Sequence, residues 1–175
     1  MILVTERLIL RPWDENDAEE LYLYAKDERV GPTCGWLPHQ SVENSRFIIL
    51  NFLKVSGIFA IVLKETKQVI GSIGISIGKK SNLKIESDEG EIGYWIGVPF
   101  WGQGLVKEAV DVLIPYAFKD LHLKRLWCCY FDGNYQSKRV MEKCGFHYHH
   151  TNENILWEKL NKIVTEHVYL LESNE

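Results

Sequence analysis

The feature that most constrains the fold is a strand–turn–helix junction over residues 93–109. Its strand side is apolar and aromatic until Pro99, which has no amide to donate to a sheet ladder. Gly102 and Gly104 permit a positive φ and leave room for another molecule to approach the backbone. The first amides of the following helix have no internal partner, and its macrodipole favours negative charge there. The junction is therefore a candidate phosphate-binding turn.

Two common nucleotide-binding motifs do not fit this turn. A dinucleotide fingerprint needs a third glycine where this chain has Lys107. The phosphate loop of nucleotide hydrolases needs Gly-Lys-Ser/Thr, which does not follow Gly104. Nucleotide binding is therefore disfavoured, while a plain glycine turn stays open as an alternative.

Four motifs in a fixed order give the chain a resemblance to a known family. They are Thr5-Glu6-Arg7-Leu8-Ile9-Leu10-Arg11-Pro12, Glu91-Ile92-Gly93-Tyr94-Trp95-Ile96, the glycine turn, and Asn134-Tyr135-Gln136-Ser137 followed by Glu142-Lys143-Cys144-Gly145-Phe146. The chain resembles the GNAT superfamily of N-acetyltransferases over roughly residues 5 to 150, most closely its RimJ/RimL branch of ribosomal-protein N-terminal acetyltransferases.

The resemblance assigns the turn to the pyrophosphate of acetyl-CoA. The family pattern is Gln/Arg-x-x-Gly-x-Gly/Ala, from which this chain departs with Trp101 in the first slot and Val106 in the small-residue slot. Lys107 would meet a phosphate or stay in solvent, and Asn134 would hold the cofactor arm, cap a helix, or both. The residues expected at the cofactor are Trp95, Ile96, Trp101, Gly102, Gln103, Gly104, Leu105, Val106, Lys107, Asn134 and Ser137.

Acetyl transfer to an amine needs a base, an oxyanion stabiliser and a donor to the thiolate. A base is needed because the pKa is about 10.4 for lysine and about 8 for an α-amino group. Glu91 is the candidate base, since alternation puts it on one strand face with Gly93 and Trp95; a surface carboxylate is the alternative. The resemblance makes Ser137 the donor and a backbone amide near Ile96 the oxyanion stabiliser. A local backbone hydrogen bond is the alternative for Ser137.

Aromatic and histidine residues supply weaker candidates. Trp36, His39 and Trp95 are expected to line the acceptor pocket, with core packing the alternative for the tryptophans. Among His147, His149 and His150, two alternating imidazoles on one strand face could bind zinc, but no third ligand is evident, so we expect a solvated face and no metal.

Size and charge narrow the class of protein. The 175 residues suit one domain over 1–175, with 46% hydrophobic and 25% charged residues. A net charge of −4 argues against nucleic-acid binding. The four cysteines include no C-x-x-C pair, and neither a signal peptide nor a transmembrane run is expected, which favours a reducing cytoplasm and no membrane association. A homo-oligomer stays open.

The order of predicted elements gives an α/β (α+β) fold. Strands are expected near residues 1–11, 58–64, 69–78, 91–98, 125–131, 146–151 and 164–171, and helices near 14–27, 41–56, 103–119 and 134–144; residues 152–162 have no assignment. These form a mixed, mostly antiparallel sheet of six to seven strands flanked by helices, with one right-handed β-α-β unit. The resemblance implies a GNAT fold, in which the two parallel central strands splay apart and the pantetheine arm pairs near Ile96.

The predicted function is transfer of an acetyl group from acetyl-CoA to a primary amine by direct attack. The acceptor is a protein N-terminus, a polyamine or an aminoglycoside-like small amine, and the sequence does not choose among them. The alternative is a non-catalytic acyl-CoA-binding sensor, which the departures at Trp101 and Val106 keep open.

Overall fold

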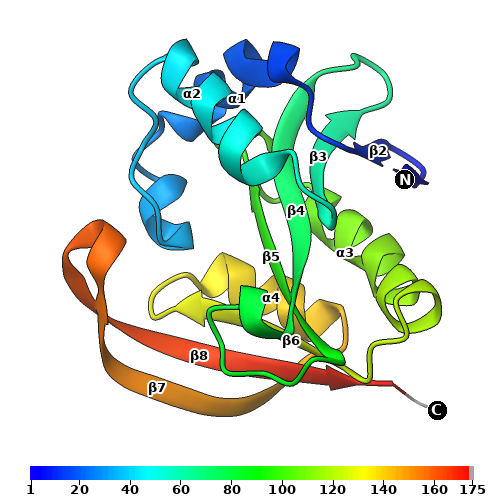
Figure 1. Cartoon of the computed structure of the whole chain (residues 1–175), viewed down its shortest axis with the longest axis vertical. Helices are drawn as coiled ribbons and strands as arrows, with labels where there is room; N and C mark the ends of the chain where they lie inside the picture. Colours follow the sequence, from blue (N-terminus) through cyan, green and yellow to red (C-terminus); the bar gives the residue numbers. More distant parts are fainter. Residues whose placement is uncertain (174–175) are drawn as a thin grey trace.

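The computed structural model describes residues 1–173, which form one eight-stranded sheet with helices on both faces (Figure 1). The sheet order is β1-β2-β3-β4-β5-β6-β8-β7, and only the β5–β6 pair is parallel. The strands are β1 Leu3–Val4, β2 Leu8–Arg11, β3 Ile58–Leu63, β4 Val69–Ile77, β5 Glu89–Ile96, β6 Arg125–Phe131, β7 His147–Trp157 and β8 Lys162–Glu172. The α-helices are α1 Ala18–Ala25, α2 Val42–Ile48, α3 Leu105–Pro115 and α4 Tyr135–Lys143.

Each face of the sheet has its own apolar core. On one face α3 inserts Leu105, Ala109, Val110 and Leu113 against the central strands, and α4 adds Met141. On the other face α1 packs Ala18, Leu21 and Ala25 with Trp13 and Ile49. Because both faces are covered, the central strands read as nearly continuous apolar runs. Across residues 1–173 no helix has the length and apolar character needed to span a membrane.

The predicted fold class is confirmed, with one strand more than expected. The extra strand arises because the N-terminal segment turns at Thr5 and pairs with itself as β1 and β2. Strand β6 and the start of helix α4 lie where the sequence predicts them. On α1 Tyr24 is buried, and its hydroxyl accepts a hydrogen bond from Gln68 Nε2 at 2.8 Å.

The bounds of β5 and α3 differ from the prediction, and the segment without an assignment belongs to the last hairpin. Strand β5 runs from Glu89 to Ile96, two residues earlier than expected, because partners on β6 bury Glu89. Helix α3 ends at Pro115 and continues as a π-helical turn over Tyr116–Asp120. The unassigned residues 152–162 complete the β7–β8 hairpin, whose bulges and left-handed Asn154 and Asn161 break the alternation.

Strands β5 and β6 pair at only three positions and then diverge. The paired residues are Glu89 with Arg125, Gly90 with Leu126, and Glu91 with Trp127. Beyond them β5 stays paired with β4 up to Ile96, whereas β6 follows β8. In Figure 1, β7 and β8 accordingly run crosswise to β4 and β5. The expected splay of the parallel central strands is therefore present.

A buried carboxylate joins β5 to β6 where they are paired. Glu89 accepts hydrogen bonds from Trp127 Nε1 at 3.0 Å and from Arg125 Nη1 at 3.1 Å, and its side chain is 7% exposed. Arg125 also pairs with Glu172 of β8, so one guanidinium links two carboxylates from different strands. Buried carboxylates of this kind are retained only when paired and hydrogen-bonded.

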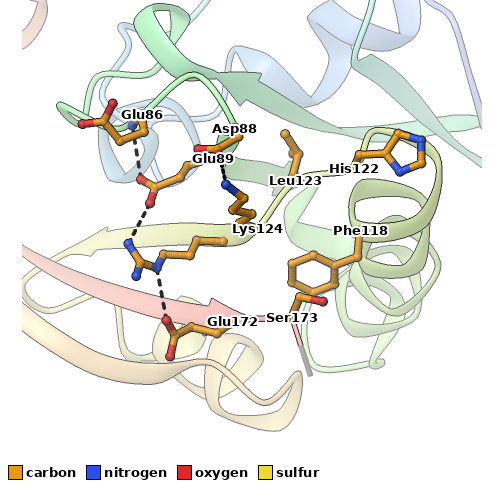
Figure 2. Close-up of a pocket in the computed structure, with 10 residues that line it drawn as sticks. Glu86, Asp88, Glu89, Phe118, His122, Leu123, Lys124, Glu172 and Ser173 are labelled. Carbon is orange, nitrogen blue, oxygen red and sulfur yellow. Dashed lines mark hydrogen bonds and ion pairs between the residues drawn. The ribbon is translucent and has the colours of Figure 1, made fainter. Parts of the chain in front are cut away.

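A hollow of about 640 Å³ lies at this joined end (Figure 2). Its charges come in opposite pairs, since Lys124 contacts Asp88 and Arg125 contacts Glu89 and Glu172. The hollow lies at the opposite end of β5 from the glycine turn. Its charged lining is explained by the contacts that hold the strands together.

Glu89→Ala should destabilise the fold because it leaves the indole N–H of Trp127 without a partner, a loss of about 1–3 kcal/mol. Asp88→Ala is the matched control, since it breaks the exposed neighbouring pair with Lys124 and should cost far less. Urea unfolding of both variants measures the difference. Equal midpoints would show that Glu89 does not hold the two strands together.

Candidate functional site

The turn between β5 and α3 is open to a ligand. Gly102 and Gly104 both have a φ of 75°, a conformation that side chains disfavour. A Cβ at Gly102 would meet nothing within 4 Å, and one at Gly104 would meet only Arg7 Nη2 at 3.8 Å. Gly104 is the N-cap of α3, and no side chain of the described residues caps the helix there. The space and the free amides fit a pyrophosphate group.

Other residues of the turn anchor it to the strand. Trp101 donates its indole N–H to the carbonyl of Ile96 at 2.9 Å, and Gln103 donates to the carbonyl of Pro99 at 2.9 Å. Leu105 is 3% exposed and packs in the core, so only its backbone faces the turn. Trp101 therefore occupies the position of the family's Gln/Arg with a structural contact to β5.

Arg7 is a cation of this site that the sequence analysis did not single out. Its Nε donates to Glu108 at 2.7 Å and its Nη1 to the carbonyl of Gln103 at 3.1 Å. Glu108 also accepts from the hydroxyl of Thr5 at 2.5 Å. The Thr5-Glu6-Arg7 motif thus attaches the N-terminal segment to the first turn of α3. These contacts span about a hundred residues of sequence, so spacing gave no signal for them.

Lys107 and Val106 lie in the first turn of α3, on its exposed or half-exposed side. Lys107 forms an i,i+4 ion pair with Asp111, with Nζ 2.5 Å from Oδ2. Its side chain is 39% exposed and that of Asp111 is 46% exposed. An exposed pair of this kind is weak, so Lys107 stays available to a competing anion.

The edge of β5 that faces β6 has no strand partner beyond Glu91. The carbonyls on this edge have other partners: Cys34 Sγ lies 3.8 Å from the carbonyl of Tyr94, and Trp101 Nε1 contacts that of Ile96. Since an amide points to the same side of a strand as its own carbonyl, the Ile96 amide points into the divergence. This is the position expected for an oxyanion donor.

Glu91 lies at the last paired position, and each of its carboxylate oxygens has at least one partner. Oε2 accepts from the hydroxyl of Ser81 at 2.6 Å and from the amide of Asn82 at 3.1 Å. Oε1 faces the thiol of Cys129 at 3.4 Å. The loop before β5 therefore folds back onto Glu91. The same sheet face carries Gly93, where a Cβ would meet nothing within 4 Å.

Ser137 lies in the first turn of α4, on the opposite side of the divergence. Its backbone amide donates to Asn134 Oδ1 at 3.3 Å, so Asn134 caps the helix as the sequence suggested. Its hydroxyl makes no local backbone contact and lies 2.9 Å from the hydroxyl of Tyr94. Tyr94 was not a predicted site residue, although alternation puts it on the face opposite Glu91.

The three predicted acceptor residues are close together. The ring of Trp36 lies 5.3 Å from that of His39 and 5.7 Å from that of Trp95. His39 is hydrogen-bonded to Ser45 at 2.8 Å, and burial lowers its pKa. Trp157 closes this side by donating its indole N–H to the carbonyl of Gly35 at 2.7 Å. The contact joins the segment before α2 to the β7–β8 hairpin.

Two histidines of β7 contact each other and strand β6. His149 and His150 face each other through their Nδ1 atoms at 2.7 Å, and His149 packs on Trp127. Among residues 1–173 no three His, Cys, Asp or Glu side chains are grouped so that they could hold a metal ion. The buried carboxylate of Glu166 lies on the same face of the sheet as Cys129. Glu166 was not among the predicted site residues.

A turn that fits pyrophosphate beside two diverging parallel strands defines the class of an acyl-CoA-dependent transferase. Known proteins agree with this class. The uncharacterized N-acetyltransferase p20 of Bacillus licheniformis is 34% identical over 82% of this chain and 81% of the relative. The putative ribosomal N-acetyltransferase YdaF of Bacillus subtilis is 30% identical over 82% of this chain and 79% of the relative.

Solved structures share the fold over the whole chain. A GNAT-family acetyltransferase from Bacillus anthracis has a TM-score of 0.85 at 22% identity, with 100% of both chains covered. The acetyltransferase (GNAT) domain matches residues 7–147, and the chain therefore belongs to the GNAT family of N-acetyltransferases. Enzymes of this family use acetyl-CoA as co-substrate, which supports the enzymatic interpretation over a sensor.

Gly104→Ala should weaken CoA binding by at least tenfold, because a methyl group would occupy the space left for phosphate oxygens. Gly145→Ala is the matched control. Its φ is also positive, the nearest atom to an added Cβ would be 3.7 Å away, and it lies just after the C-terminal end of α4, away from the glycine turn. Both changes carry the same left-handed strain of about 1–2 kcal/mol. Calorimetric titration with CoA separates them, and equal affinities would exclude the turn as the cofactor site.

Proposed function

We propose that the enzyme acetylates a primary amine by direct attack, with Glu91 as the base and Ser137 as the donor to the departing thiolate. The observation that carries this proposal is the divergence of β5 from β6, which has Glu91 on one side and Ser137 on the other. A base and a donor on opposite sides of one gap suit attack from one side and departure on the other. Acetyl-CoA supplies the acetyl group.

The remaining predicted residues take supporting roles in this proposal. The amides after Gly104 and the cation of Lys107 hold the pyrophosphate, while Gly102 leaves it room. The Ile96 amide stabilises the carbonyl oxygen as charge develops, which typically contributes about 2.7–4 kcal/mol. Asn134 keeps α4 in place through its cap.

The acceptor approaches from the side of Glu91, between Trp36 and the β7–β8 hairpin. Two carboxylates, Glu91 and the 4% exposed Glu166, face this side, which favours a cationic amine. The name of the relative YdaF supports a ribosomal-protein N-terminus as the first acceptor to assay. Peptides with a free α-amine, peptides with only a lysine amine, and a polyamine form the panel, read by mass spectrometry.

We also keep a reducing cytoplasm as the proposed compartment. The four cysteines of the chain, Cys34, Cys128, Cys129 and Cys144, are all free thiols. Free cysteines at this number suit a reducing environment.

Glu91→Gln should depress kcat/KM most near neutral pH and least at high pH. The reason is that the acceptor amine is protonated below its own pKa of about 8 to 10.4 and then depends on a base, whereas above it the amine attacks unaided. The amide is isosteric and can still accept from Ser81 and Asn82. The pH–rate profile of kcat/KM is the measurement.

Ser81→Ala is the control for this prediction. It removes one contact to Glu91 but leaves the carboxylate in place. If Ser81→Ala reproduces the Glu91→Gln profile, the role of Glu91 is to anchor the loop. If wild type and Glu91→Gln give parallel profiles, Glu91 is not the base. The proton of the amine then passes to solvent or to another carboxylate.

Ser137→Ala should lower kcat by about 10²-fold, the low end of the usual range for acid assistance, because a thiolate is a fair leaving group. The helix cap uses the backbone amide of Ser137 and survives the change. CoA affinity should therefore stay within twofold of wild type. A kcat equal to that of wild type would leave Ser137 without a catalytic role.

A further inference from the structure

The hydroxyl of Tyr94 connects β5 to α4 across the divergence. It lies 2.9 Å from Ser137 Oγ and 3.1 Å from the carbonyl oxygen of Ser137. Tyr94 comes three residues after Glu91, the last position where β5 pairs with β6. The phenol is therefore fixed on one of the diverging elements while its hydroxyl contacts the other.

The phenol hydroxyl has one hydrogen and two acceptors on Ser137. If it donates to the carbonyl, the hydroxyl of Ser137 donates back to the phenol oxygen and points away from the gap. If it donates to Oγ, the hydrogen of Ser137 is free for a third group. The orientation of the Tyr94 hydrogen thus decides whether Ser137 can donate into the gap.

A serine alone is a poor donor to a thiolate. An alcohol is a far weaker acid than a thiol, whose pKa is about 8.5, so Ser137 acts through a hydrogen bond. Such a bond strengthens when its own oxygen accepts another, by about 10–30%. Tyr94 keeps its hydrogen, since burial raises its pKa well above the usual value. The neighbouring thiols of Cys128 and Cys144 stay neutral because burial raises both of their pKa values.

We infer that Tyr94 is a positioning residue that turns the hydroxyl of Ser137 toward the departing thiolate. The hydrogen bonds then run from Tyr94 to Ser137 and from Ser137 to the sulfur. This inference rests on the proposed role of Ser137. It adds that the role depends on a residue of β5, because the hydroxyl of Tyr94 orients that of Ser137.

The thiol pKa of bound CoA provides a test that needs no acceptor. The ultraviolet absorbance of the thiolate is titrated against pH for CoA bound to wild type, Tyr94→Phe, Ser137→Ala and the double variant. Losing the bond from Ser137 should raise this pKa by about one to two units. Tyr94→Phe should raise it by roughly half a unit or more. The double variant should match Ser137→Ala alone.

Kinetics give the second readout through a double-mutant cycle. Tyr94→Phe should lower kcat by about tenfold with little change in the KM for acetyl-CoA, and should have no further effect in the Ser137→Ala background. Tyr130→Phe is the control, since it removes another buried phenol hydroxyl that does not contact Ser137. It should leave the thiol pKa unchanged.

The outcomes separate this inference from the proposed function. If Ser137→Ala shifts the thiol pKa but Tyr94→Phe does not, or if their kinetic losses simply add, Tyr94 only packs and the inference is overturned. If neither variant shifts it, both the role of Ser137 and that of Tyr94 fail. If wild type acetylates no amine of the panel, the thiol titration still decides the role of Tyr94.

Discussion

The three-residue pairing of β5 with β6 is the constraint on which the site depends. A longer pairing would close the gap between β5 and β6. Without any pairing, the two strands would not be held side by side. Glu89 holds the two strands together at the paired end, because its carboxylate accepts hydrogen bonds from Arg125 and Trp127 of β6. Strand β6 then follows β8, and β5 follows β4. The opening thus lies where the two strands, joined at one end, follow different neighbours.

The two sides of the gap carry different polar groups, because successive side chains of β5 point to opposite faces of the sheet. Glu91, Gly93 and Trp95 share one face of β5, while Tyr94 faces α4 on the other. A register shift of one residue in β5 would exchange the two sets. The pairs Gly71–Ile96 and Gly74–Gly93 with β4 hold that register. The chemistry on both sides of the gap therefore depends on the β4–β5 ladder.

Local features of the site were predictable from sequence, and long-range pairs were not. The glycine turn, the cap at Asn134 and the bounds of β6 follow from local rules on glycine, capping and alternation. The hydroxyl contact between Tyr94 and Ser137 joins residues 43 apart, and no spacing rule reports such a pair. Both strands of the last hairpin were predicted, but residues 152–162 had no assignment because the bulges of β7 interrupt the alternation on which strand prediction relies.

The departure at Trp101 changes how the turn must hold phosphate. Its indole is committed to the carbonyl of Ile96, so it offers the ligand no polar group. In the proposed cofactor site, phosphate binding would then depend on the first amides of α3 and on the two cations nearby, Arg7 and Lys107. Each cation already contacts a carboxylate: Arg7 contacts Glu108, which is 18% exposed, and Lys107 contacts Asp111, which is 46% exposed. Because solvent screens the exposed Lys107–Asp111 pair, a doubly charged pyrophosphate can compete for Lys107 more readily than for Arg7.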